Sequence, residues 1–171
     1  TLLALAEEGR QLCAAGLSIA KAGAENAATM PTQPGEGVLA SPNLEGIARF
    51  YAVIDARMGQ LYTAAYEHRA GLWHTVQEPA VQNPADCALP QVWSGQPVWA
   101  VGMAQGLLPD LGGAALTWVP AHPTASALLR LADQAQAHGG EVSPALALPL
   151  YLRDKVAQTT AERAQAKIPP A

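Results

Sequence analysis

The stretch that decides the fold is 49–66, RFYAVIDARMGQLYTAAY. Its first apolar run, Phe50–Ile54, has the composition of a strand, and the run Gln60–Tyr66 has the composition of a second one. A third β-type run, Leu72–Val76, follows after another short turn that contains glycine. Because connections this short join antiparallel neighbours, the sequence predicts an antiparallel three-strand meander.

Downstream of the meander, the signals for strands and helices alternate. Asn83-Pro84 is typical of a helix start, since Asn is a favoured N-cap and Pro is tolerated at the first helical position. The remaining predicted elements are strands at 98–101 and 116–119 and a helix at 124–138, which Gly139-Gly140 ends. This order predicts an α/β fold: a mixed sheet with packed helices.

Upstream of the meander, the pattern predicts one helix followed by irregular chain. Apolar residues recur at helical spacing over 1–16, with Thr1 as a candidate N-cap and Gly16 as the stop. Residues 17–48 are rich in Ala, Gly and Pro, which favours a linker or an insertion. The main lobe is then expected at 49–157 and a flexible tail at 158–171. Since the chain starts inside a helical pattern without Met, we expect it to be part of a longer protein.

The composition limits the classes of function. Charged residues make up 14% of the 171 residues, and the formal net charge is −4, so strong direct binding to a nucleic-acid backbone is not expected. Cys13 and Cys87 are the only cysteines and match no metal-binding spacing. No apolar stretch is long enough to span a bilayer, and no signal peptide is evident. We therefore expect a cytoplasmic protein.

The turn between the first two predicted strands is the main candidate site. Asp55 could bind a metal ion or water, and Arg57 could pair with a phosphate or a carboxylate. A turn that contains Gly59 can also present backbone N–H groups to an anion. The same residues fit an ordinary β-turn in which Gly59 supplies a positive φ and Asp55 caps the turn, and spacing alone favours this second interpretation.

Other candidate sites are weaker. The glycines of Val101–Gly106 could let a nucleotide approach, but they also fit a tight turn. The four histidines match no metal or catalytic motif, and no serine lies in a nucleophile-elbow context. The segment Pro149–Ala157 reads as an extended stretch that docks an aromatic residue and an arginine onto the lobe.

Two separated segments resemble one known family. The run IDARMGQLY at 54–62, followed by Ala64-Ala65-Tyr66, resembles the IDAR-M-G-x-x-Y segment of the TsaB (YeaZ) family. The closing Pro149-x-Tyr151-Leu152-Arg153-x-x-Val156-Ala157 is similar to that family's closing segment. The resemblance covers most of 49–157. It marks five residues as structural signatures: Tyr62, Pro149, Tyr151, Leu152 and Arg153.

The resemblance implies a fold and a place for the candidate turn. The fold is an actin-like ATPase (ASKHA, ribonuclease-H-like) lobe, of which this chain would hold the C-terminal one together with the interlobe helix at 1–16. Asp55, Arg57 and Gly59 would then lie on the hairpin that faces the cleft between lobes. In active relatives of the superfamily this hairpin touches nucleotide phosphates, whereas Arg57 and Met58 are bulkier than the small residues usual there.

The resemblance also implies a function without catalysis. Members of this family act in making threonylcarbamoyladenosine in tRNA, as non-catalytic partners of a TsaD-type paralogue and a TsaE-type ATPase subunit. ATP and metal would belong to those partner subunits, and no cofactor is expected in this chain. A homodimer is a further expectation, and tRNA would be met only through the complex.

Two alternatives of other classes stay open at this point. A glycoprotease-like peptidase would need a metal site or an activated nucleophile, and the sequence shows neither. A nucleotide-binding, sugar-kinase-like lobe would need a phosphate cradle from two lobes. Binding of ATP or ADP that is lost on Arg57→Ala would favour this last alternative.

Overall fold

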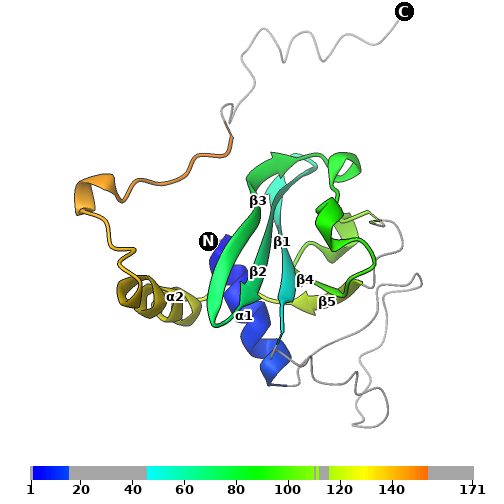
Figure 1. Ribbon diagram of the computed structural model, residues 1–171. Coiled ribbons are helices and arrows are strands. Elements are labelled where there is room, and N and C mark those ends of the chain that lie inside the picture. The colour runs from blue at the N-terminus through cyan, green and yellow to red at the C-terminus, as the bar shows by residue number, and fades with distance from the viewer. Residues whose placement is uncertain (1, 16–45, 110, 112–115, 154–171) are drawn as a thin grey trace, which may run out of the picture. The chain divides into compact units, whose positions relative to one another are not determined.

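The described part of the chain is a mixed five-stranded sheet with helices, followed by an extended segment. The structure is a computed structural model that describes residues 2–15, 46–109, 111 and 116–153. It divides into a first unit, residues 1–141, and a second, residues 142–171. The first unit contains the sheet and both α-helices (Figure 1). The α/β class predicted from the sequence is confirmed.

The strands have the predicted order and are longer than predicted. They are β1 (Ala48–Arg57), β2 (Gln60–Arg69), β3 (Leu72–Gln82), β4 (Val98–Gly102) and β5 (Leu116–Pro120), arranged β3-β2-β1-β4-β5 in the sheet. The first three form the predicted antiparallel meander, and β4 and β5 add in parallel to β1. Because β1, β4 and β5 run the same way, their carboxyl ends lie at one edge of the sheet.

The turn between β2 and β3 is a two-residue connection of Ala70 and Gly71. Both residues have positive φ, 50° and 80°, as a type I′ turn requires. Gly71 meets this requirement without strain, whereas a side chain such as that of Ala70 disfavours the left-handed region.

We expect Ala70→Asn to stabilise the protein by about 1 kcal/mol, because Asn tolerates left-handed backbone far better than Ala. Urea unfolding followed by circular dichroism measures the change. Gly71→Ala is the matched control: nothing lies within 4 Å of the position that its Cβ would take, so its cost is conformational, about 1 kcal/mol of destabilisation. Unchanged stability in Ala70→Asn would contradict the turn assignment.

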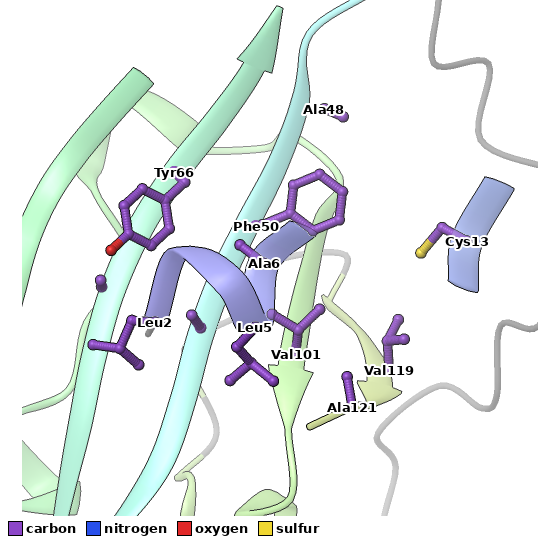
Figure 2. Close-up of a cluster of buried hydrophobic side chains, with 12 residues drawn as sticks. Leu2, Leu5, Ala6, Cys13, Ala48, Phe50, Tyr66, Val101, Val119 and Ala121 are labelled. Carbon is purple, nitrogen blue, oxygen red and sulfur yellow. The ribbon is translucent and has the colours of Figure 1, made fainter. Parts of the chain in front are cut away.

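Helix α1 (Leu2–Ala14) covers one face of the sheet, as the helical period at 1–16 predicts; Thr1 and Gly16 lie outside the described residues. Its apolar side packs on Phe50 of β1 and Tyr66 of β2, which alternate onto that face (Figure 2). The helix also lies very close to β4, since a Cβ at Gly9 would overlap the side chain of Val101. Only glycine permits this approach.

The other face of the sheet is covered by the chain between β3 and β5 rather than by a helix. The helix expected from Asn83 is wrong: Pro84–Asp86 is a single 3-10 turn, and the Asn83 side chain makes no capping hydrogen bond. Asn83 Nδ2 instead donates to Asp86 Oδ2 at 2.9 Å. Further 3-10 turns at Gln91–Trp93 and Gln105–Leu107 complete this layer, and Trp93 is its largest buried side chain.

Helix α2 (Ala125–Ala137) confirms the predicted second helix. Thr124 is its N-cap, and the Thr124 hydroxyl accepts a hydrogen bond from the backbone N–H of Ala127 at 3.0 Å. Gly139, with φ 69°, follows its end, as the sequence indicated. The helix lies against α1 rather than on the sheet.

The second unit holds the closing signature residues. Its described part contains one 3-10 turn, Pro144–Leu146, and then extended chain to Arg153. The expectation that Tyr151 docks on the lobe concerns how the two units meet and stays a prediction. The predicted tail at 158–171, with Val156 and Ala157, and most of the predicted linker lie outside the described residues.

Candidate functional site

The candidate site is the edge of the sheet where the parallel strands end. Val53 of β1 lies beside Gly102 of β4, and Gly102 lies beside Pro120 of β5. Because β1 runs on to Arg57, the hairpin between β1 and β2 projects beyond the ends of β4 and β5. Asp55, Arg57 and Gly59 lie together at the hairpin turn, as predicted from the sequence, and the structure places this turn at the tip of the edge.

Asp55 holds the hairpin turn. Its Oδ1 accepts a hydrogen bond from the backbone N–H of Arg57 at 2.7 Å, and its Oδ2 lies 3.5 Å from Arg57 Nη1. The ion pair is solvent-exposed and contributes little, since the Arg57 side chain is 86% accessible. This is the capped turn that spacing alone favoured in the sequence.

The backbone of the tip is unusual. Arg57, Met58 and Gly59 have φ of 66°, 56° and 73°, so three consecutive residues adopt left-handed backbone. A register shift between Asp55 and Arg57 accompanies them, as in a β-bulge. Left-handed backbone disfavours residues such as Arg57 and Met58, and their side chains are mostly exposed. The tip therefore presents large side chains where a phosphate-binding hairpin needs close backbone approach.

Gly102 brings β4 against β1 at the same edge. Its φ is 146°, which L-residues rarely adopt, and a Cβ there would overlap the carbonyl oxygen of Val53. Leu5 of α1 also lies near this position. Gly102 thus serves close strand packing, a role that differs from both interpretations given to Val101–Gly106 in the sequence, a nucleotide approach and a tight turn.

Tyr62 lies at the base of the hairpin and is partly buried on the face of the sheet that α1 covers. It packs against the cluster beneath α1 and pairs with Ile54 of β1 and Val81 of β3. Its role in the fold is therefore to hold the hairpin onto the α1 face. The remaining signature residues, Pro149, Tyr151, Leu152 and Arg153, belong to the second unit.

A polar network around Glu7 was not predicted from the sequence. Glu7 is fully buried, yet its carboxylate accepts hydrogen bonds from Arg10 at 2.9 Å, Gln11 at 3.0 Å and Arg130 at 2.9 Å. The indole N–H of Trp73 in β3 donates to it at 3.2 Å. Burial alone would raise the pKa of Glu7, but the hydrogen bonds from Arg10, Gln11 and Arg130 outweigh it and lower the pKa to about 2.

Glu8 extends this network to α2. Its Oε2 accepts from Arg130 Nη2 and from the Thr124 hydroxyl, both at 2.9 Å. The two adjacent carboxylates of α1 therefore connect the helix to β3 on one side and to α2 on the other. The sequence alone indicates only the local part of this network, because Arg10 and Gln11 follow Glu7 at helical spacing, three and four residues later. Trp73 and Arg130 are far away along the chain, so no local pattern connects them to Glu7.

Burial raises the pKa of two thiols and two phenols that could otherwise act as nucleophiles. Burial raises the pKa of the Cys13 thiol to about 11, and burial together with Glu78 raises the pKa of Tyr66 to about 12. Burial also raises the pKa of Cys87 and of Tyr51. A thiol or phenol in this state is a poor nucleophile.

The histidines and carboxylates of the described residues do not assemble into a metal centre. No group of three or more His, Cys, Asp or Glu among residues 2–15, 46–109, 111 and 116–153 is placed to hold an ion. His68 lies beside the Trp73 ring at 5.0 Å, and burial followed by the charge of Arg10 lowers its pKa. Within the same ranges, neither α-helix has the length and apolarity needed to cross a bilayer.

Comparisons with known proteins point to one group. No protein-family model matches the chain. Over 123 residues, 66% of this chain, it is 37% identical to the tRNA threonylcarbamoyladenosine biosynthesis protein TsaB of Escherichia coli strain K12, of which it covers 51%. Among solved structures it resembles YeaZ from Pseudomonas aeruginosa, with a TM-score of 0.52, 31% identity, and coverage of 61% of this chain and 48% of that one.

A second solved structure gives the same picture. It is an uncharacterized protein with similarity to peptidase YeaZ, from Pseudomonas aeruginosa, with a TM-score of 0.53 and 30% identity. The match covers 61% of this chain and 49% of that one. The chain thus spans about half the length of the relatives that it matches, and its sheet is consistent with a ribonuclease-H-like, actin-like lobe.

Proposed function

Because the chain belongs to the TsaB (YeaZ) family along the lobe that it spans, we propose that it acts in making threonylcarbamoyladenosine in tRNA. In this role it is a non-catalytic part of the machinery and supports a TsaD-type threonylcarbamoyl transferase. The observation that carries the proposal is the 37% identity over 123 residues to the Escherichia coli protein named for this biosynthesis.

The chemistry of the lobe supports the non-catalytic part of the proposal. A catalytic nucleophile needs a lowered pKa or an adjacent base, whereas burial raises the pKa of Cys13 to about 11 and of Tyr66 to about 12. The buried carboxylate of Glu7 is occupied by two arginines, Gln11 and an indole. Its geometry fits a stabilising role, because no acceptor position is left for a substrate proton.

The edge with the β1–β2 hairpin then forms one wall of a cleft. Asp55 caps the turn, and Arg57 and Gly59 set its left-handed backbone, so these residues shape the wall rather than cradle a phosphate. In this proposal ATP and metal belong to the partner subunits, a TsaD-type paralogue and a TsaE-type ATPase, and the chain itself holds no cofactor. It works in the cytoplasm and meets tRNA only through the complex.

The proposal is tested in cells that lack the gene for the protein that carries this chain. Nucleosides from their tRNA are separated and quantified by mass spectrometry, and we expect a several-fold loss of threonylcarbamoyladenosine that the restored gene reverses. An unchanged content would overturn the proposed function.

A second assay tests whether the chain is catalytic by itself. The purified 171-residue chain, incubated with tRNA and a threonylcarbamoyl donor, should form no modified nucleoside. Product formed by the chain alone, at a rate abolished by Arg57→Ala, would show that the lobe carries the reaction itself.

A further inference from the structure

Arg49 is a largely buried arginine whose guanidinium donors are poorly used. It is the second residue of β1, and its side chain is 15% exposed. Within the described residues it forms one ion pair, 3.5 Å from its Nε to Glu67 Oε1, and Nε is buried without a hydrogen bond. Burying a charged donor without a hydrogen bond is unfavourable, so this position favours a further anionic acceptor beside the guanidinium.

The surroundings of Arg49 carry more positive than negative charge. Arg69 Nη1 lies 4.0 Å from Glu67 Oε2, so two arginines share one carboxylate in a chain whose formal net charge is −4. His74 pairs with Glu67 across β2 and β3 and therefore stands on the same face of the sheet. We call Arg49, Glu67, Arg69, His74 and Trp93 the Arg49 cluster.

Trp93 fixes one oxygen of Glu67 and leaves the other open. Its indole N–H donates to Glu67 Oε1 at 2.9 Å, and the Trp93 side chain is almost fully buried, which holds the carboxylate in place. No side chain of the described residues donates a hydrogen bond to Oε2, since the Arg69 guanidinium stays 4.0 Å away. The Arg49 cluster thus offers guanidinium donors together with one fixed carboxylate acceptor.

This combination of donors and an acceptor selects among anions. Guanidinium groups bind carboxylates and phosphates through paired, charge-assisted hydrogen bonds. A carboxylate or a sulfate has no proton to donate to Glu67, whereas a phosphate group, with a second pKa of about 6, retains one for Oε2. We propose that the Arg49 cluster binds a phosphate group, with Arg49 and Arg69 as donors and Glu67 as the acceptor.

The Arg49 cluster is separate from the candidate site at the hairpin. Arg49 lies at the start of β1 and Arg57 at its end, and eight residues of strand span about 26 Å. A phosphate bound at the cluster is therefore a different ligand site from the hairpin that the nucleotide-binding alternative involves. This inference rests on the cluster alone and is independent of the proposed function.

A phosphate titration of the full chain, followed by NMR at constant ionic strength, tests the proposal. The indole N–H of Trp93 is the reporter, and that of Trp73, which donates to Glu7 on the opposite face, is the internal control. We expect the Trp93 resonance alone to shift, with a Kd on the order of 1 mM, and sulfate to bind about tenfold more weakly. A Trp93 resonance that does not move, or that moves equally with sulfate, would overturn the proposal.

Two arginine variants locate the bound anion. Arg69→Gln alters a side chain that is 51% exposed, so the fold is retained, and it should weaken phosphate binding by about tenfold. Arg57→Gln removes an exposed arginine at the hairpin and should bind phosphate like the parent chain. Binding that is lost in Arg57→Gln but kept in Arg69→Gln would place the anion at the hairpin and refute the assignment to the Arg49 cluster.

Glycerol 3-phosphate distinguishes the two sources of a phosphate group. If it shifts the Trp93 resonance with a Kd similar to that of inorganic phosphate, the cluster accepts a phosphate carried by a larger molecule. If only inorganic phosphate shifts it, the cluster is a site for the free anion. A shift that appears with neither compound contradicts the proposal.

Discussion

Glu7→Gln should lower the free energy of unfolding by about 3 kcal/mol, because it breaks a buried charge network from its centre. The carboxylate oxygens accept hydrogen bonds from Arg10, Gln11, Arg130 and Trp73, whereas Gln offers one oxygen and places an amide N–H₂ against these donors. The arginine side chains are 18% and 35% exposed, so water recovers part of the loss, and the lower end of the usual range applies.

Urea unfolding measures this loss, and two variants make it specific. Asp133→Asn also removes a carboxylate from an exposed helical position and should change stability by less than about 0.5 kcal/mol. A double-mutant cycle of Glu7→Gln with Arg130→Gln should give a coupling of about 1–2 kcal/mol. Additive effects would mean that α2 is not held by Glu7.

The same network predicts how stability depends on pH. The pKa of Glu7 falls from its ordinary value of 4.5 to about 2 in the folded protein, so its contribution is complete above pH 4.5 and is lost as the pH falls toward 2. At about 1.4 kcal/mol for each pH unit, this contribution is again about 3 kcal/mol. Glu7→Gln should flatten the loss of stability over this interval, and an unaltered acid profile would contradict the lowered pKa.

The meander and helix α2 were predictable because local signals agree with the tertiary structure there. Alternation and Gly59 define the first hairpin, and Thr124 and Gly139 bracket the helix. The sequence did not predict that only a single 3-10 turn follows Asn83. An N-cap residue followed by Pro84 is typical both of one 3-10 turn and of a full helix. The residues after a helix start decide its length, and here Pro90 lies seven residues after Asn83.

The candidate site was predictable in its position but not in its conformation. Asp55 and Gly59 indicate a turn, yet nothing in the sequence shows that Arg57 and Met58 share the left-handed backbone with Gly59. The Glu7 network depends on Trp73 and Arg130, which only the fold brings to α1. Local patterns therefore locate the edge of the sheet, whereas long-range packing decides which charges are buried.

Gly102→Ala should lower the free energy of unfolding by about 3–4 kcal/mol or more, because two destabilising effects add. The residue has φ 146°, which disfavours any L side chain, and its new Cβ would overlap the carbonyl oxygen of Val53. That oxygen belongs to the backbone of β1, so it cannot move aside as a side chain would. The strands β1 and β4 must separate where they form the edge.

Gly106→Ala provides the matched control for Gly102→Ala. Gly106 lies four residues further along the chain, nothing lies within 4 Å of its Cβ position, and its φ is not positive, so stability should change by less than about 0.5 kcal/mol. Thermal unfolding should therefore separate the two variants by well over 10 °C for a lobe of this size. Similar melting temperatures would mean that β4 does not approach β1 this closely. They would contradict the arrangement of β1 and β4 at the edge that carries the hairpin.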